Sequence, residues 1–418
     1  MKARSLTHLG FVLVAATICQ AQTTGGTAAS VKKAVNPPPR PYQAPSLPSA
    51  GTNATLREEP SLPGNVAGYA AGAFAFLHPS IHYSLQYGDA VPSGPGERKK
   101  STIHRLTPSL RAVFAEQWTF SYSPSFVWYS NSAFEKQADH NVALHGSGRT
   151  GDVDIGLNQT YSHSTEALIE TGQQTKQEVW GTSISAAKPI TDRLVAEVSG
   201  SQQLRFTDTF TDTRAWNGSG WLRYQYSSSL TLGGGIGGGY TAITPGADFT
   251  SRFAKTNLRW TAGPRLSTEI TLGADFTKST ADDSSTHSSP AYGVNLRYQI
   301  FEPTAVVLTA DRSVGTTYFS EQMSDLREVS LRLEQRILGR LQLYLSASRS
   351  DADYIQARRT VNTQDRSDKL TVLRASLGAR FFDRLPVSIS WQHNRNDSNN
   401  RVYALRSTTV GLNVGWDF

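Results

Sequence analysis

Polar and charged side chains, arginine prominent among them, occupy every second position in several segments of this 418-residue chain. In residues 329–337, Arg332, Glu334 and Arg336 alternate with Val, Leu and Ile. Successive side chains of a strand point to opposite faces, so these charges share one face and the apolar residues share the other. The planar guanidinium fork suits carboxylates, and a row of cations attracts counter-ions through water. The chemistry indicated is therefore electrostatic attraction of anionic or polyhydroxylated solutes.

The same alternation places charges on the polar face of several other segments. Facing lipid at mid-depth of a membrane would cost ~2–4 kcal/mol for each Arg or Lys, so these charges must line water or pair with one another. Further acidic candidates on this face are Glu197, Asp275 and Asp311. A conduit and a structural ladder of ion pairs are both consistent with the pattern. The predicted interior residues are Arg223, Lys255, Arg259, Glu269, Arg297, Arg332, Glu334, Arg336, Arg374 and Arg380.

Catalytic chemistry has weaker support in the sequence. His163 has Asp154 within ten positions, and His287 follows Asp282 and Asp283. Neither histidine has the spacing of a nucleophile elbow or of an HExxH zinc site. We therefore predict no catalytic residue, no metal site and no cofactor.

The N-terminus has the features of a secretory signal. Lys2 and Arg4 precede an apolar stretch from Leu9 to Ile18, and small residues allow cleavage after Ala21. Cleavage there would also remove the single cysteine, so we expect no disulfide or thiolate site in the exported protein. We assign residues 1–21 to this signal.

Proline punctuates the following segment, which we place at residues 22–79. Proline cannot donate to a strand ladder, so we expect a disordered or polyproline-like periplasmic tether. Residues 66–77 are apolar and rich in Ala and Gly, and either a short plug or an early strand fits them. We assign residues 80–418 to a β-barrel domain for the reasons that follow.

The last ten residues, 409–418, form a strand with one apolar face and one small, polar face. A strand that ends on an aromatic residue is typical of the C-terminal assembly signal of outer-membrane barrels, and Phe418 would supply it. The apolar face comprises Val410, Leu412, Val414, Trp416 and Phe418.

From residue 80 onward, amphipathic segments are joined alternately by short turns and by long polar connections. The short turns lie near residues 115–117, 147–151, 188–192, 227–229, 262–265, 301–303, 338–340 and 382–386, and the long connections include 88–100, 162–177, 278–290 and 350–366. Short periplasmic turns and long extracellular loops are typical of a transmembrane antiparallel up-and-down barrel, and the spacing gives about 18 strands, with 16 also plausible.

Aromatic residues gather at both ends of these segments, which predicts two membrane-interface girdles. The clearest girdle residues are Trp118, Trp216, Tyr226, Trp260, Trp391 and Trp416. Tyr318 and Tyr354 also lie near predicted long loops, and we expect them in the upper girdle.

Composition excludes several other classes of protein. Beyond the signal no apolar run reaches the ~20 residues of a transmembrane helix, and the mean hydropathy is −0.38. The formal charge of +7 includes Lys2 and Arg4, so it is too modest for a nucleic-acid-binding surface. Residues 233–239 read Gly-Gly-Gly-Ile-Gly-Gly-Gly, but no Lys-Ser/Thr follows, as a phosphate loop would require. We expect a smooth patch where a loop or a neighbouring barrel packs.

The proline-rich tether, the strand pattern of residues 80–418 and the ending Val414-Gly-Trp-Asp-Phe418 together resemble the outer-membrane β-barrel porin families, and among them a group associated with exopolysaccharide systems. The resemblance implies a location in the bacterial outer membrane, contact with its lipid, and assembly by the barrel-assembly machinery through the C-terminal strand. It transfers no residue role and leaves the oligomeric state open.

Three functions fit this sequence. The leading hypothesis is a non-enzymatic channel for passive passage of hydrophilic solutes, with surface-polysaccharide export as a variant. The second is a surface, adhesion or assembly barrel whose loops bind a partner. The third is an outer-membrane hydrolase that uses His163 or His287.

Overall fold

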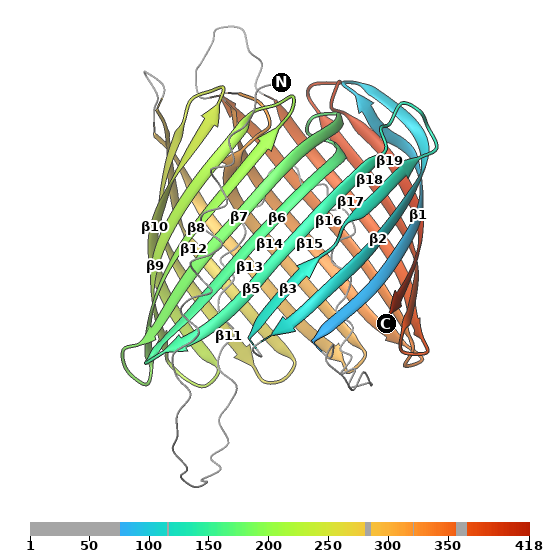
Figure 1. Ribbon diagram of the computed structural model, residues 1–418. Helices are drawn as coiled ribbons and strands as arrows, with labels where there is room; N and C mark the ends of the chain where they lie inside the picture. The colour runs from blue at the N-terminus through green and yellow to red at the C-terminus, as the bar shows by residue number, and fades with distance from the viewer. Residues whose placement is uncertain (1–75, 115–116, 281–285, 321, 357–365) are drawn as a thin grey trace. The chain divides into compact units, whose positions relative to one another are not determined.

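A computed structural model of the protein describes residues 76–114, 117–280, 286–320, 322–356 and 366–418, which all belong to one compact unit. Every element in these residues is a strand (Figure 1). The strands are β1 (Leu77–Gly94), β2 (Glu97–Phe114), β3 (Trp118–Tyr122), β4 (Ser125–Tyr129), β5 (Gln137–Thr150), β6 (Val153–Leu168), β7 (Gln173–Pro189), β8 (Leu194–Thr207), β9 (Asp212–Gln225), β10 (Leu230–Thr244), β11 (Phe249–Ala262), β12 (Leu266–Ser279), β13 (Thr286–Phe301), β14 (Thr304–Thr316), β15 (Gln322–Ile337), β16 (Leu341–Gln356), β17 (Ser367–Phe381), β18 (Leu385–Ser398) and β19 (Leu405–Asp417).

The strands form one closed antiparallel barrel. Each strand pairs with its neighbours in sequence, and β19 pairs with β1 from Ser80↔Asp417 to Gly88↔Thr409. The short strands β3 and β4 both pair with β2 and with β5, so together they occupy one strand position. Pro124 lies in the break between them, and proline removes a ladder hydrogen bond. The 19 segments therefore make an 18-stranded barrel, which confirms the predicted fold.

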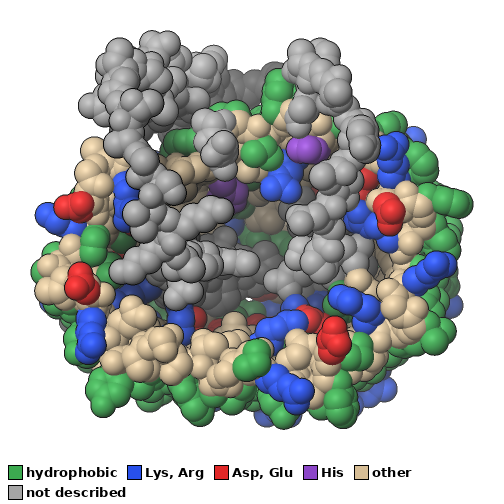
Figure 2. All heavy atoms as spheres, turned by 90° about the horizontal axis from the view of Figure 1, so that it is seen from below, with side chains coloured by type: hydrophobic (Ala, Val, Ile, Leu, Met, Phe, Trp, Pro, Cys, Tyr) green, Lys and Arg blue, Asp and Glu red, His purple; other side chains and the backbone are tan. Residues whose placement is uncertain are grey.

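The outer face of the barrel is apolar and exposed. Val198, Leu222 and Ile236 expose more than half of their surface on the outer wall, and Phe418 exposes 70%. Figure 2 shows apolar side chains around the outside and charged side chains around the opening. Such a surface would be unstable in water, and lipid covers it in barrels of this construction. The protein is a bacterial outer-membrane β-barrel. No helix in the described part of the chain is long and apolar enough to cross a membrane.

The eight predicted short turns all join consecutive barrel strands at one end of the barrel. Three of them turn through a glycine with a positive φ, which avoids the steric cost that a Cβ would bring: Gly151, Gly263 and Gly339. The C-terminus lies at the same end (Figure 1). Short turns mark the periplasmic end of a bacterial barrel, so the opposite end is extracellular.

Two of the predicted long connections, 88–100 and 162–177, are mostly strand, whereas parts of the other two, 278–290 and 350–366, lie outside the described residues. Only residues 95 and 96 separate β1 from β2, and only residues 169–172 separate β6 from β7. The paired strands continue beyond the membrane through residues that we expected in loops. Water contacts both faces of a strand there, so the alternation of apolar and polar side chains disappears although the backbone pairing persists.

The barrel begins at Leu77, three residues before the predicted start. The predicted signal at residues 1–21, the tether and most of the segment 66–77 lie outside the described residues.

The glycine-rich run, residues 233–239, lies within β10, and its glycines have different roles on the inner and outer faces of the barrel wall. On the inner face a Cβ at Gly235 would overlap the Trp221 ring, and one at Gly237 would overlap Phe253. These glycines therefore seat two inward aromatic rings. On the outer face, nothing lies within 4 Å of a Cβ built on Gly234, so the predicted smooth patch is present there.

Candidate functional site

The ten predicted interior residues all lie on the face of the sheet opposite the exposed apolar side chains. The register shows this on β11, where Lys255 and Arg259 alternate with the outward Trp260. The predicted face assignment therefore agrees with the structure, and their role as the lining of a conducting pore stays a prediction.

Most of the inward cations pair with carboxylates on the same strand, on the next strand or one strand further along. The inward ion pairs are Arg223–Glu197 at 3.1 Å, Lys255–Asp275 at 2.8 Å, Arg259–Glu269 at 3.3 Å, Arg297–Glu334 at 2.9 Å, Arg332–Glu334 at 4.0 Å and Arg380–Asp417 at 3.4 Å. Arg374 instead donates from Nε to Oε1 of Gln392, at 2.9 Å. Arg336 is exposed near the periplasmic end of β15. Positive and negative side chains thus lie side by side on the inner wall. This arrangement is compatible with both interpretations of the sequence, a charged conduit and a structural ladder of ion pairs.

The connection between β14 and β15 crosses the extracellular mouth of the barrel. Its tip, residues 317–320, contacts the β6–β7 turn and strand β8, which belong to a distant part of the wall. Six strands separate β7 from β14 in the barrel order, so the tip reaches nearly the opposite side. The tip and the residues that hold it form what we call the mouth cluster: Glu170, Arg205, Tyr318, Arg366, Asp368 and Tyr403.

Tyr318 is the centre of the mouth cluster and is only 2% exposed. Its backbone N–H donates to Oε1 of Glu170 at 3.1 Å, and its hydroxyl donates to Oε1 of Gln177 at 2.8 Å. Thr211 donates to the Tyr318 carbonyl from both its N–H and its hydroxyl. The Arg205 guanidinium lies 4.2 Å from the centre of the Tyr318 ring and bonds the Thr317 carbonyl. The backbone and the hydroxyl of Tyr318 are therefore bonded to three other segments of the chain.

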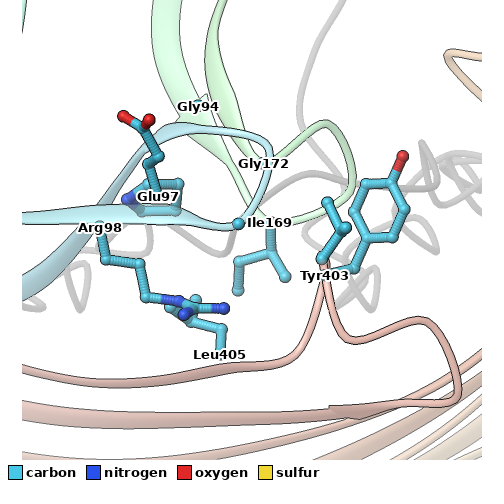
Figure 3. A pocket seen from close by; sticks show the side chains of 10 residues that line it. Gly94, Glu97, Arg98, Ile169, Gly172, Tyr403 and Leu405 are labelled. Carbon is cyan, nitrogen blue, oxygen red and sulfur yellow. The ribbon is translucent and has the colours of Figure 1, made fainter.

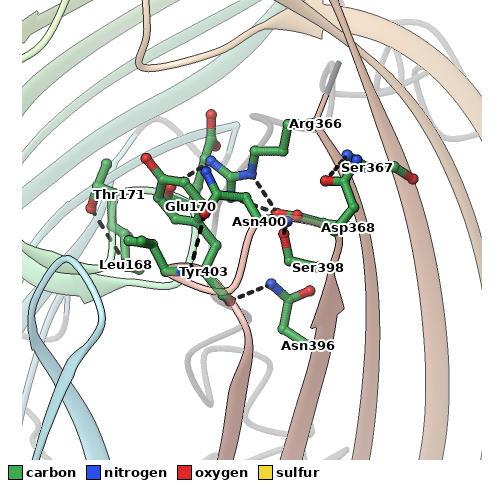
Figure 4. Close-up of polar contacts among 12 residues, drawn as sticks. Leu168, Glu170, Thr171, Arg366, Ser367, Asp368, Asn396, Ser398, Asn400 and Tyr403 are labelled. Carbon is green, nitrogen blue, oxygen red and sulfur yellow. Dashed lines mark hydrogen bonds and ion pairs between the residues drawn. The ribbon is translucent and has the colours of Figure 1, made fainter. Parts of the chain in front are cut away.

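Arg366 ties a second set of loops to the same cluster (Figure 4). Its guanidinium lies 3.5 Å from the centre of the Tyr403 ring and 4.4 Å from that of Tyr354. It also donates to the Asp368 carboxylate and, from Nη1, to the Glu170 carbonyl at 3.1 Å. Cation–π contacts strengthen when the cation is shielded from water, and this side chain is buried.

Beside the cluster, three extracellular connections meet around a small pocket (Figure 3). Gly94 and Glu97 come from the β1–β2 hairpin, Ile169 and Gly172 from the β6–β7 turn, and Tyr403 from the β18–β19 connection. The pocket volume of about 10 Å³ is barely enough for one water. It shows that these connections pack against each other, and it is too small to bind a solute.

Two predicted girdle residues belong to this cluster instead of the membrane surface. Tyr318 and Tyr354 are buried inside the mouth, which corrects the sequence prediction. The six clearest girdle residues do lie on the outer face, and five of them are exposed: Trp216, Tyr226, Trp260, Trp391 and Trp416, with Trp118 stacked on Phe114.

The predicted hydrolase candidates are not assembled as a catalytic site. His163 lies on the outer face of β6 with its ring 6.1 Å from that of His140, whereas Asp154 lies at the periplasmic end of β6 and pairs with Arg149. His287 lies on the inner face of β13, and Asp282 and Asp283 lie outside the described residues. Within those residues, no three His, Cys, Asp or Glu side chains gather as a metal site.

Burial raises the pKa of Glu170 to about 7, although Arg205 and Arg366 act in the opposite direction. The ordinary pKa of a glutamate carboxyl is 4.5. Glu170 therefore binds its proton more tightly when the mouth cluster is packed than when the cluster is open and the carboxyl faces water. The closed mouth is therefore most favoured below about pH 4.5, loses stability as the pH rises to about 7, and is constant above it.

We expect bilayer recordings of the wild type to show more time in open levels at pH 8 than at pH 5. Glu170→Gln keeps an acceptor for the Tyr318 N–H but cannot ionise, so this variant should lose the dependence between those two values. An equal pH response in wild type and variant would contradict the assignment.

No protein-family model matches the chain, and no curated protein sequence matches it. Solved structures with some likeness include OccK3 (OpdO) of Pseudomonas aeruginosa, at 11% identity and a TM-score of 0.46 over 82% of this chain and 95% of that one. OccAB3 of Acinetobacter baumannii matches at 11% identity and 0.45, over 82% and 99%. A bacterial polysaccharide outer membrane secretin matches at 8% identity and 0.36, over 81% and 98%.

Proposed function

We propose that this barrel is a passive channel for small hydrophilic solutes, with the β14–β15 tip as its extracellular constriction. The observation that carries the proposal is a closed 18-stranded wall whose inner face bears charged side chains along its length. Barrels of 16–18 strands are wide enough to leave an aqueous channel. The charged side chains on the inner wall favour a water-filled interior, because charged groups are more stable in water than in an apolar medium.

The mouth cluster supports small solutes over a polymer. A tip that is bonded to nearly the opposite wall divides the entrance, and an extended polysaccharide would have to displace it. The described extracellular connections also turn toward one another, which supports a channel over a barrel that presents free loops for adhesion.

The interior ion pairs support a moderate preference for anions. Cations outnumber acids eight to two among the ten predicted interior residues, but three inward carboxylates outside that set, those of Glu197, Asp275 and Asp417, pair with three of the cations and reduce the excess. A paired Arg still polarises the nearby water, although much less strongly than a free one. We therefore expect anionic solutes to be favoured without neutral ones being excluded.

Planar-bilayer recording of the purified, refolded protein tests the proposal directly. We expect stable single-channel steps, with a modest anion preference at low salt. Liposomes that contain the barrel should also swell in small neutral sugars faster than empty liposomes. Folded protein that gives neither conductance nor swelling, at several voltages and after the mouth has been opened by mutation, would contradict a channel.

A further inference from the structure

Two cations stand on the outer, lipid-facing wall near its extracellular edge. Arg252 shares the outer face of β11 with Trp260, and Lys278 shares the outer face of β12 with Phe276. Both side chains are exposed. Arg252 is directly opposite Phe276, so Lys278 is its diagonal neighbour, at roughly 7–8 Å between Cα atoms.

Neither cation has an ion-pair partner within the described residues. Some outward cations do, as Arg349 bonds Asp351 at 3.1 Å and Arg395 bonds Asp397 at 2.9 Å. The carboxylate nearest in sequence to Arg252 is that of Asp248, and it already accepts from the Tyr240 hydroxyl and the Ile243 N–H. Two unpaired like charges side by side are unfavourable unless an anion joins them.

The cations lie among outward aromatic residues near the extracellular ends of their strands, with Phe276 directly opposite Arg252. The register places Trp216, Tyr240, Thr250 and Lys278 in one row across β9 to β12, with Arg252 one step nearer the membrane centre. The Trp216 and Tyr240 rings are stacked at 6.1 Å. Such girdles sit at the level of the lipid headgroups, and long cationic side chains extend toward that level.

A hollow without side chains begins beside Arg252. Gly200, Gly218 and Gly238 are paired in register on the outer faces of β8, β9 and β10, and Gly238 is directly opposite Arg252. A Cβ at Gly200 or Gly218 would meet only a backbone oxygen at 3.9 Å, whereas one at Gly238 would meet the Ser251 carbonyl at 2.8 Å and the Arg252 side chain at 3.7 Å, so the open part of the hollow lies over β8 and β9. The neighbouring Ile236 is 69% exposed and forms one side of the hollow.

We propose that this face binds a phosphorylated lipid of the outer leaflet, with its phosphate between Arg252 and Lys278 and an acyl chain in the glycine hollow. Arginine and lysine both bind phosphate, and arginine does so through paired hydrogen bonds. A headgroup phosphate supplies the missing counter-charge at the right depth. The glycines explain why a lipid is favoured over a free phosphate ion, because the hollow accepts hydrocarbon. The assignment does not depend on the channel proposal.

Native mass spectrometry of the intact barrel in detergent, titrated with diphosphorylated lipid A, tests this site. The double variant Arg252→Gln with Lys278→Gln should bind roughly tenfold more weakly, as expected when charge-assisted hydrogen bonds to phosphate are lost. The matched control is Arg349→Gln with Arg395→Gln, which removes the same charge from the same outer rim and should bind as the wild type does. Fully dephosphorylated lipid A should bind the wild type as weakly as phosphorylated lipid binds the first variant.

Gly218→Leu tests the hollow with both charges intact and should also weaken binding. Each variant is checked for folding by heat-dependent migration on a gel, and the charge variants carry the test if the leucine variant does not fold. Equal binding by the wild type and the Arg252/Lys278 variant would overturn the proposal. So would a wild-type dimer that dissociates in that variant without any change in lipid binding, because the face would then join two copies of the chain.

Discussion

Replacing the β14–β15 tip, residues 317–320, with two glycines is expected to raise the single-channel conductance several-fold. The tip carries Tyr318 across the mouth, and its removal eliminates the bonds to Glu170 and Thr211. The wall strands β14 and β15 remain paired from Thr304↔Gln335 to Thr316↔Met323, so the barrel should keep its shape. Single-channel recording at fixed salt and voltage measures the change.

The matched control shortens a turn of the same length at the other rim. Replacing residues 190–193, between β7 and β8, with two glycines alters no contact of the mouth cluster and should leave the conductance close to that of the wild type. Tyr318→Phe, which loses only the bond to Gln177, should have a smaller effect than loss of the whole tip. Unchanged conductance after tip removal would show that the solute path does not pass this point.

Neutralising the two sides of one interior ion pair is expected to shift ion selectivity in opposite directions. Glu334 lies 2.9 Å from Arg297 and 4.0 Å from Arg332. Glu334→Gln removes one negative charge that faces Arg297 and Arg332 and should favour anions, whereas Arg297→Gln should favour cations. Reversal potentials across a salt gradient, centred near 0.1 M where the Debye length is about 10 Å, measure both shifts.

Arg327→Gln is the control, because Arg327 lies on the same strand, β15, but on the outer face, where it bonds Asp353 at 2.7 Å. It should not change selectivity. The shifts should also shrink at about 1 M salt, where the Debye length falls to about 3 Å. If the Glu334 and Arg297 variants shift selectivity no more than the control, these pairs stabilise the wall and do not face the solute path.

The membrane-embedded part of the fold could be predicted from sequence because its two faces meet different solvents. Lipid demands apolar side chains at one parity, as at Leu331 and Leu333, and water allows charge at the other, as at Arg332. The same contrast gave the strand number and the inward charges correctly. Each of the eight short turns was signalled by local turn residues.

The mouth could not be predicted in the same way. Above the membrane both faces are wet, so nothing in residues 88–100 or 162–177 marks the continuing strands. The contact between Tyr318 and Glu170 joins positions 148 residues apart and has no local pattern. The one local signal was the pair Tyr318-Phe319, two adjacent aromatic residues near a predicted loop. Arg366 gave no signal, because its aromatic partners come from two other segments.

The pairing of β19 with β1 means that the first barrel strand to leave the ribosome must wait for the last one before it has a second neighbour. Until then the two edge strands of the incomplete sheet would each have a row of unpaired backbone N–H and C=O groups, and the hydrocarbon of the bilayer cannot hydrogen-bond to them. A half-synthesised copy consequently has no stable resting place in the bilayer. Stable insertion therefore requires that β19 be available to pair with β1, and this single pairing closes the barrel.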